Sequence, residues 1–205
     1  MSAPMPIDSP APRLRNVDRW GAVSQLFHWL IVVGILAMAI IGLTMVEMPS
    51  SPDKVRMFAL HKSIGLTILA LVTLRLLWRL YAGTPPAIPT VPRWQHRIAN
   101  VSHIGLYVLL FAMPISGWVM NSASGFPLWW FGLFRVPALV GRDRDLHELT
   151  ETVHETLFWL LILLVLVHAG AAFYHHLFQR DATLARMLPR GWLPAPSADE
   201  DVRHG

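Results

Sequence analysis

The chain has 205 residues, of which 54% are hydrophobic and only 15% charged, and its mean hydropathy is +0.44. Because soluble domains carry about a quarter charged residues, this shortage of charge predicts long segments inside a lipid bilayer. The absence of cysteine excludes disulfides, thiolate zinc sites and iron–sulfur clusters held by thiolates. The net charge of +4 is spread along the chain without a basic stripe, so we expect no nucleic-acid partner.

Residues 1–18 are polar and rich in proline, and they predict a disordered N-terminus. This segment has no apolar stretch beside its basic residues and no small-residue cleavage site, so we expect no cleaved signal peptide. Residues 191–205 predict a disordered tail. A single domain is expected between these segments, over residues 19–190.

Four apolar segments follow one another within this domain. They cover about residues 24–46, 58–81, 98–121 and 152–178. Each provides the ~20 helical residues that cross ~30 Å of hydrocarbon, and helices are the only open-chain structure that satisfies the backbone polar groups in lipid. The sequence therefore predicts an all-α fold, an integral membrane four-helix bundle with antiparallel up-down topology.

The connections between these segments agree with that topology. Residues 48–55 predict a short turn, and the Pro-rich residues 83–92 cannot continue a helix. The longest connection, residues 122–149, contains the aromatic stretch FPLWWFGLF at residues 126–134, which we expect to lie in the membrane interface. Pro114 is expected to kink the third helix.

Lysine and arginine are distributed unequally between the two ends of such a bundle. Eleven lie on the side of the termini, namely Arg13, Arg15, Arg19, Arg75, Arg79, Arg93, Arg97, Arg180, Arg186, Arg190 and Arg203. Six lie on the other side, namely Lys54, Arg56, Lys62, Arg135, Arg142 and Arg144. Because cytoplasmic loops carry the excess of these residues, both termini are expected in the cytoplasm.

Four histidines of the apolar segments are candidate cofactor ligands: His28, His61, His154 and His168. His154 and His168 are fourteen residues apart, so they face within about 40° of each other and lie ~21 Å apart along the helix axis. Because consecutive helices are antiparallel, His28 is expected level with His168 near the cytoplasmic surface. By the same reasoning His61 is expected level with His154 near the outer surface, which gives two pairs at two depths.

Two imidazoles facing each other across a bundle suit the two axial positions of a haem iron. Without a Cys-x-x-Cys-His motif the haem would be non-covalent and of b type. With both axial positions filled it would transfer electrons. The alternatives are ordinary interfacial histidines and a bare metal site such as zinc in a transporter; the zinc site is disfavoured because intramembrane carboxylates are nearly absent.

Other polar residues at the cytoplasmic end have two interpretations each. His175, seven residues after His168, either exchanges protons at a quinone pocket or is interfacial, since histidine titrates near neutral pH. Arg75, fourteen residues after His61, either pairs with a haem propionate or reaches out to the interface as an anchor, the role that suits Arg79. His96, His103 and His176 are interpreted as interfacial residues or propionate partners, and His147 and His204 as solvated.

Over roughly residues 19–190 the chain resembles the bacterial cytochrome b561 family, the four-helix di-haem proteins of the inner membrane. The matching stretches are RWGAVSQLFHWL with His28, LHKSIG with His61, TVHETLFWL with His154, and LVHAGAAFYHHLFQRDATLARMLPR with His168, His175 and His176. LRLLWRL and MPISGW also match.

This resemblance implies that His28 and His168 ligate one haem iron, and that His61 and His154 ligate the other. It also implies a ubiquinone site near the cytoplasmic haem, with His175 at the matching position. The implied activity is electron transfer across the inner membrane to or from the quinone pool. One member type oxidises superoxide at the periplasmic face and reduces ubiquinone, so the expected outer partner is superoxide or a periplasmic redox protein.

Three functional hypotheses therefore stand. The first is a membrane di-haem cytochrome, such as a superoxide:ubiquinone oxidoreductase. The second is an anchor subunit that passes electrons for a partner dehydrogenase or hydrogenase, and the third is a haem-free helical transporter or scaffold. An outer cluster of Lys54, Arg56 and Lys62 favours an anionic donor, whereas the acids of residues 143–151 weaken that attraction.

Overall fold

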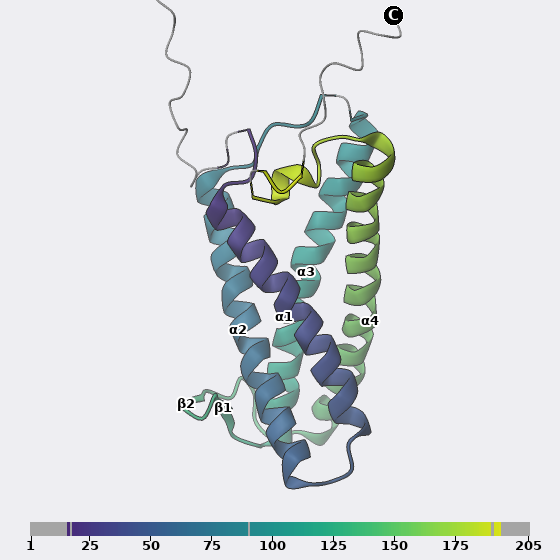
Figure 1. Cartoon of the computed structure of the whole chain (residues 1–205). Helices are drawn as coiled ribbons and strands as arrows, with labels where there is room; N and C mark the ends of the chain where they lie inside the picture. The colour runs from purple at the N-terminus through teal and green to yellow at the C-terminus, as the bar shows by residue number, and fades with distance from the viewer. Residues whose placement is uncertain (1–15, 17, 90, 190, 194–205) are drawn as a thin grey trace, which may run out of the picture.

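The computed structural model describes residues 16, 18–89, 91–189 and 191–193. Within these residues four long helices form an antiparallel bundle (Figure 1). The helices are α1 (Ala22–Glu47), α2 (Pro52–Ala82), α3 (Arg93–Ser124) and α4 (Arg144–Tyr174). The predicted all-α membrane bundle is confirmed, because all four helices are long and apolar enough to cross a membrane. Most of the two termini predicted to be disordered lies outside the described residues.

The helices extend beyond the apolar segments because polar residues cap them. The Ser51 side chain accepts a hydrogen bond from a backbone N–H in the first turn of α2, which begins at Pro52 and not near residue 58. Asp143 does the same for α4, which begins at Arg144 and not near residue 152. Gly83 ends α2 with a φ of 76°, a conformation that favours glycine. Hydropathy alone underestimates such polar ends.

The link between α3 and α4 forms a small hairpin, which the aromatic composition of this stretch does not predict. Strands β1 (Leu128–Trp130) and β2 (Phe134–Val136) are antiparallel, with Leu128 opposite Val136. The turn uses positive φ at Phe131 and Gly132. The indole of Trp130 donates to Thr67 at 3.1 Å, so the predicted aromatic interfacial stretch is folded as a hairpin against α2 (Figure 1).

The bundle has a thin interior core. Helices α1 and α2, α2 and α3, and α3 and α4 pack in chain order. The core consists of Ile31, Ile68 and Val72, with partly buried apolar side chains of α1, α2 and α3 around them. Many large apolar side chains on the outside of the helices remain exposed. That surface suits contact with lipid, since it is far more apolar than a soluble protein would present to water.

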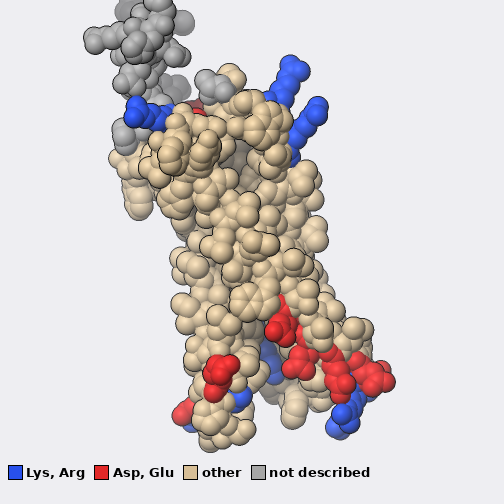
Figure 2. Space-filling model, turned by 90° about the vertical axis from the view of Figure 1, so that its right-hand side faces the viewer, with Lys and Arg blue, Asp and Glu red and all other residues tan. Residues whose placement is uncertain are grey.

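The charged residues agree with a membrane-crossing bundle. Figure 2 shows an uncharged band between the two ends of the molecule, with acidic side chains gathered at the end where α4 begins. We call this end, with the hairpin and the turn between α1 and α2, the hairpin end. The opposite end, where α1 begins and α4 ends, is called the terminal end.

Polar contacts from α1 close the terminal end. The residues after α4 turn back across the start of α1 and include a short 3-10 helix, Ala185–Met187. The Gln25 amide donates to the Leu188 carbonyl at 3.0 Å, and the Trp29 indole donates to the Met187 carbonyl at 3.0 Å. Arg19 also donates to the carbonyl oxygens of Ala185 and Leu188. The last described segment therefore folds back over the start of α1.

Candidate functional site

The four candidate histidines meet as two pairs inside the bundle. The ring centroids of His28 and His168 are 6.3 Å apart with an interplanar angle of 69°. The ring centroids of His61 and His154 are also 6.3 Å apart, with an angle of 70°. The first pair joins α1 to α4 near the terminal end, and the second joins α2 to α4 near the hairpin end. Helix spacing and antiparallel topology predicted this arrangement.

At the hairpin-end pair, a serine fixes which nitrogen of His154 carries a proton. The Ser116 hydroxyl donates to the Met113 carbonyl at 2.8 Å, and its oxygen lies 2.9 Å from His154 Nδ1. Because the hydroxyl proton is already used, the serine oxygen accepts from Nδ1–H. The Nε2 atom of His154 then has a free lone pair, which is the state that an imidazole ligand of a metal requires.

Two glycines bring backbone close to these rings. A Cβ atom on Gly117 of α3 would lie 3.0 Å from Cε1 of His154, and a Cβ on Gly42 of α1 would lie 3.5 Å from Cε1 of His61. Among the described residues, the Nδ1 atom of His61 is buried and has no hydrogen-bond partner. A buried polar atom of this kind carries a desolvation cost, and at this position it lies on a ring directed toward His154.

At the terminal-end pair, an arginine from α2 contacts His28. The guanidinium of Arg75 lies 2.8 Å from His28 Nδ1, and its Nε donates to the Tyr107 hydroxyl at 3.3 Å. A guanidinium can only donate, so His28 Nδ1 accepts in this contact. Among the described ion pairs none joins Arg75 to a carboxylate. A cation inside the bundle without an anion is a natural partner for an acidic ligand group.

A third histidine lies beside the terminal-end pair. The ring centroid of His103, from α3, is 5.3 Å from that of His168. Close to this end of the bundle, the guanidinium of Arg79 contacts two aromatic rings: it lies 5.7 Å from the ring centroid of Trp20 and 5.6 Å from that of Tyr107. The role of His103 as an interfacial or propionate-contacting residue stays a prediction, and its position against His168 makes it the control residue for any ligand assignment.

The pairs fit the geometry of a haem with two axial imidazoles. Metal–imidazole bonds are about 2 Å long, and two of them together with the two ring radii span roughly 6 Å, which matches the observed 6.3 Å. Neither α1 and α4 nor α2 and α4 are among the described helix pairs whose backbones pack closely, so each histidine pair bridges two helices that are not in close backbone contact. In the described part of the chain, no group of three or more His, Asp or Glu residues is arranged so that it could hold a bare metal ion.

At the terminal end, His175 forms an unpredicted pair with an acid. Its Nδ1 lies 2.6 Å from Oδ2 of Asp181. The pair is formed where α4 continues as a π-helix, His175–Gln179, before the chain turns back. Asp181 is the single acidic residue between Glu155 and residue 190, and that isolation is the sequence signal that could have identified it.

The remaining histidines do not join these pairs. His147, interpreted as solvated, is half-buried, and its Nδ1 lies 3.1 Å from the Met120 carbonyl, so that interpretation is wrong. His96 Nε2 lies 3.2 Å from the Ile88 carbonyl. His176 lies beside His175 in the π-helix, and His204 lies outside the described residues.

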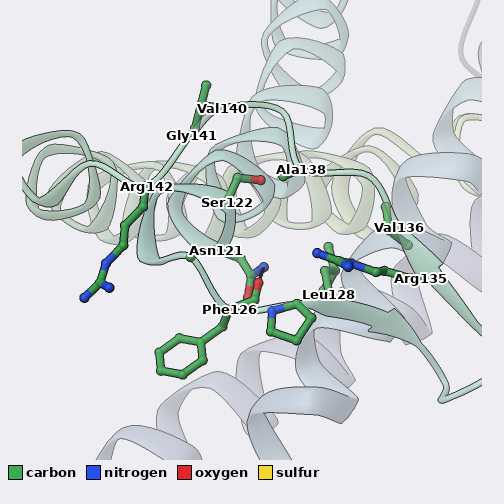
Figure 3. A pocket seen from close by; sticks show the side chains of 12 residues that line it. Asn121, Ser122, Phe126, Leu128, Arg135, Val136, Ala138, Val140, Gly141 and Arg142 are labelled. Atoms are coloured by element: carbon green, nitrogen blue, oxygen red, sulfur yellow. Dashed lines mark hydrogen bonds between the residues drawn. The ribbon is translucent and has the colours of Figure 1, made fainter.

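A pocket of about 200 Å³ opens at the hairpin end (Figure 3). Asn121 lies in its wall with only 5% of its surface exposed, and its amide nitrogen donates to the Phe126 carbonyl at 3.0 Å. Asn121 Oδ1 has no partner among the described residues. Arg135 and Arg142 both line the pocket, and the side chain of Arg142 points away from Asn121 (Figure 3). Because Asn121 follows Gly117 by one helical turn, the pocket lies ~6 Å along α3 from the His154 contact.

Comparison with known proteins gives consistent matches along most of the chain. The family model for prokaryotic cytochrome b561 matches residues 19–190. Cytochrome b561 homolog 2 of Escherichia coli (strain K12) is 33% identical over 178 residues, which cover 83% of this chain and 92% of that protein. Cytochrome b561 homolog 1 of the same organism is 35% identical over 130 residues, 63% of this chain and 73% of that protein.

A third relative carries a more specific name. The probable superoxide oxidase CybB of Yersinia pestis is 31% identical over 166 residues, which cover 80% of this chain and 92% of that protein. The matched region includes all four helices and both histidine pairs. The chain therefore belongs to the prokaryotic cytochrome b561 family, a family of b-type haem proteins that transfer electrons in the bacterial inner membrane.

Proposed function

We propose that the protein is a di-haem cytochrome that carries electrons between the two membrane surfaces and exchanges them with the quinone pool. The observation that supports this most strongly is the meeting of His28 with His168 and of His61 with His154 at the same centroid distance of 6.3 Å. These four residues would hold two haem irons as axial ligands. Bound haem would supply one-electron oxidation and reduction at each pair.

Arg75 would serve a haem propionate at the terminal-end pair. Coordination through Nε2 of His28 requires that nitrogen to be unprotonated, and its Nδ1 would then carry the ring proton. A protonated Nδ1 cannot accept from Arg75, so the guanidinium would be released from the 2.8 Å contact. A propionate is the anion that the released cation would meet, while the Tyr107 hydroxyl keeps Arg75 directed into the bundle.

The electron acceptor on the proposed route is a quinone at the terminal end, next to His175. Reduction of a quinone to a quinol takes two electrons and two protons, so a site that reduces quinone needs a proton-exchanging group. His175 is such a group, and it lies seven residues, ~10 Å, beyond His168 along α4. The charge distribution supports a terminal end in the cytoplasm, so that the protons would come from that side.

The proposed donor at the hairpin end is superoxide. The name of the Yersinia pestis relative motivates this choice, and the pocket beside Arg135 offers a cation to a small anion close to His154. Two superoxide ions would each give up one electron and leave as O₂, and one quinone would take the two electrons and two cytoplasmic protons. The acidic side chains at the same end of the molecule (Figure 2) repel an anion such as superoxide. Its attraction to the pocket would therefore depend on the positive charge of Arg135.

The function is tested on the purified chain in proteoliposomes that contain ubiquinone-1. We expect a pyridine haemochrome assay to give two b-type haems per chain. Superoxide from xanthine oxidase should reduce the haems and then form quinol, and added superoxide dismutase should abolish both signals. A colourless protein would instead support a haem-free transporter or scaffold. If superoxide does not reduce the haems and a dehydrogenase or hydrogenase subunit co-purifies, the result would support the hypothesis that the chain is an anchor subunit.

Substituting Gly117→Ala is expected to disturb the hairpin-end haem selectively. The added methyl group would lie 3.0 Å from Cε1 of His154, and the ring would have to move away from the Ser116 contact. Haem content should fall from two toward one per chain by the haemochrome assay. Gly141→Ala is the control, because a Cβ there meets no atom within 4 Å. Full haem content with unchanged spectra in the Gly117 variant would contradict the assignment of His154.

A further inference from the structure

A histidine–aspartate pair lies where α4 ends. The Nδ1 atom of His175 and the Oδ2 atom of Asp181 are 2.6 Å apart, and their side chains are 17% and 6% exposed. A contact this short, shielded from solvent, is typical of a charge-assisted hydrogen bond. Because a carboxylate only accepts, Nδ1 of His175 carries a proton in this contact. The other ring nitrogen, Nε2, is the one left for a ligand.

The backbone around the pair is shaped so that the two side chains meet. The helix widens into the π-helix His175–Gln179, and Arg180 then adopts a left-handed conformation with a φ of 49°. The backbone N–H of Asp181 donates to the His175 carbonyl at 3.2 Å, so the two residues are linked through both backbone and side chain. π-Helical turns of this kind are frequent at functional sites. A continuous α-helix would have carried residue 181 away from His175.

The Asp181 carboxylate is fixed independently of His175. Its Oδ1 accepts the backbone N–H of Thr183 at 2.8 Å. Burial raises the pKa of the Asp181 carboxyl, but hydrogen bonds from Thr183 and His175 outweigh burial and bring the pKa below its ordinary value. The carboxylate is therefore ionised at neutral pH. It is a permanent acceptor for Nδ1–H, whether the ring is neutral or charged.

We propose that Asp181 is a positioning residue for the quinone site, which holds the His175 ring so that Nε2 is its only proton-exchanging atom. This inference rests on the proposed function. With Nε2 protonated, the ring is an imidazolium that can donate to a quinone carbonyl oxygen. Once that proton has moved to the quinone oxygen, the neutral ring keeps Nδ1–H on Asp181, and Nε2 can take a new proton from cytoplasmic water. One ring proton is lost and regained for each proton delivered, and the outer donor supplies the two electrons.

The test uses the haem-loaded full chain and ubiquinone-1, with Asp181→Asn, His175→Gln and His176→Gln. Asparagine keeps the size of the side chain and an oxygen for Thr183 but removes the charge. We expect kcat for quinone reduction to fall about 100-fold in His175→Gln and about tenfold or more in Asp181→Asn, within the range of a lost acid–base group. The KM for ubiquinone-1 should change less than about threefold, because the quinone would still bind. His176→Gln, in the same π-helix, should match the unchanged protein.

Two further measurements separate positioning from simple stabilisation. In the double variant His175→Gln/Asp181→Asn, the loss should be no greater than in His175→Gln alone, because Asp181 acts through the ring. ¹⁵N NMR of the unchanged protein should show His175 protonated at Nδ1, with an Nε2 signal that shifts when ubiquinone-1 is added. If Asp181→Asn fails to retain haem, this spectrum of the unchanged protein still tests whether Asp181 holds the proton of His175 on Nδ1.

The possible outcomes are distinguishable. If the unchanged protein binds two haems but does not reduce ubiquinone-1, the proposed function is wrong, and the role of the pair is wrong with it. If the unchanged protein is active and Asp181→Asn matches His176→Gln, only the role of Asp181 is wrong. A His175 ring protonated at Nε2 alone, or unresponsive to the quinone, would also overturn it.

Discussion

Single alanine substitutions of the four paired histidines are expected to remove one haem each and to fall into two classes. His28→Ala and His168→Ala should both lose the terminal-end haem, because each leaves its iron with one axial ligand. His61→Ala and His154→Ala should both lose the hairpin-end haem. The pyridine haemochrome assay should therefore give about one haem per chain in all four variants, against two in the unchanged protein. Redox titration should show the same remaining haem within each class and different ones between classes.

His103→Ala is the decisive control for this experiment. Its ring contacts His168, but the centroid distance of 5.3 Å is shorter than the roughly 6 Å that two metal–imidazole bonds require. We therefore expect His103→Ala to retain both haems. If it loses the terminal-end haem while His28→Ala keeps it, His103 and not His28 is the partner of His168. If the redox titration shows the same remaining haem in all four paired variants, the assignment to two pairs is wrong.

The depth pairing of the histidines could be predicted because lipid leaves few structural choices. Each span must be a helix, and consecutive spans must alternate in direction. The fourteen-residue spacing of His154 and His168 then fixes both their depth and their shared face. These two constraints predict the two pairs without knowledge of the side-chain packing between helices, but they do not predict that His103 of α3 also lies against His168.

The contacts around the rings could not be predicted in the same way. Ser116 reaches His154 from a different helix, and such a contact depends on how far α3 is rotated about its axis, which spacing along one helix does not determine. Asp181 reaches His175 only because the end of α4 widens into a π-helix, and no periodicity in the sequence marks that change. The strands β1 and β2 have three residues each, which is too short for an alternating pattern to mark a strand in the sequence.

The largest functional effect is expected when one pair is removed from the proposed electron route. With the haem at one pair missing, electrons from the outer donor would have to cross the ~21 Å between the two pairs along α4 without a carrier. In proteoliposomes, His61→Ala should therefore form quinol from superoxide only at the background rate without protein. Ubiquinol-1 added to the same variant should still reduce the terminal-end haem, because that pair and His175 are untouched.

His28→Ala should give the converse result. Superoxide should still reduce the hairpin-end haem in this variant, because its ligands His61 and His154 and the neighbouring Arg135 are unchanged, but no quinol should follow. Stopped-flow spectroscopy of the haem bands, together with a quinol assay on the same samples, measures both halves of the route. The two variants act as controls for each other, since each keeps the half that the other lacks. If either variant forms quinol from superoxide at the full rate, the two pairs do not belong to one electron path.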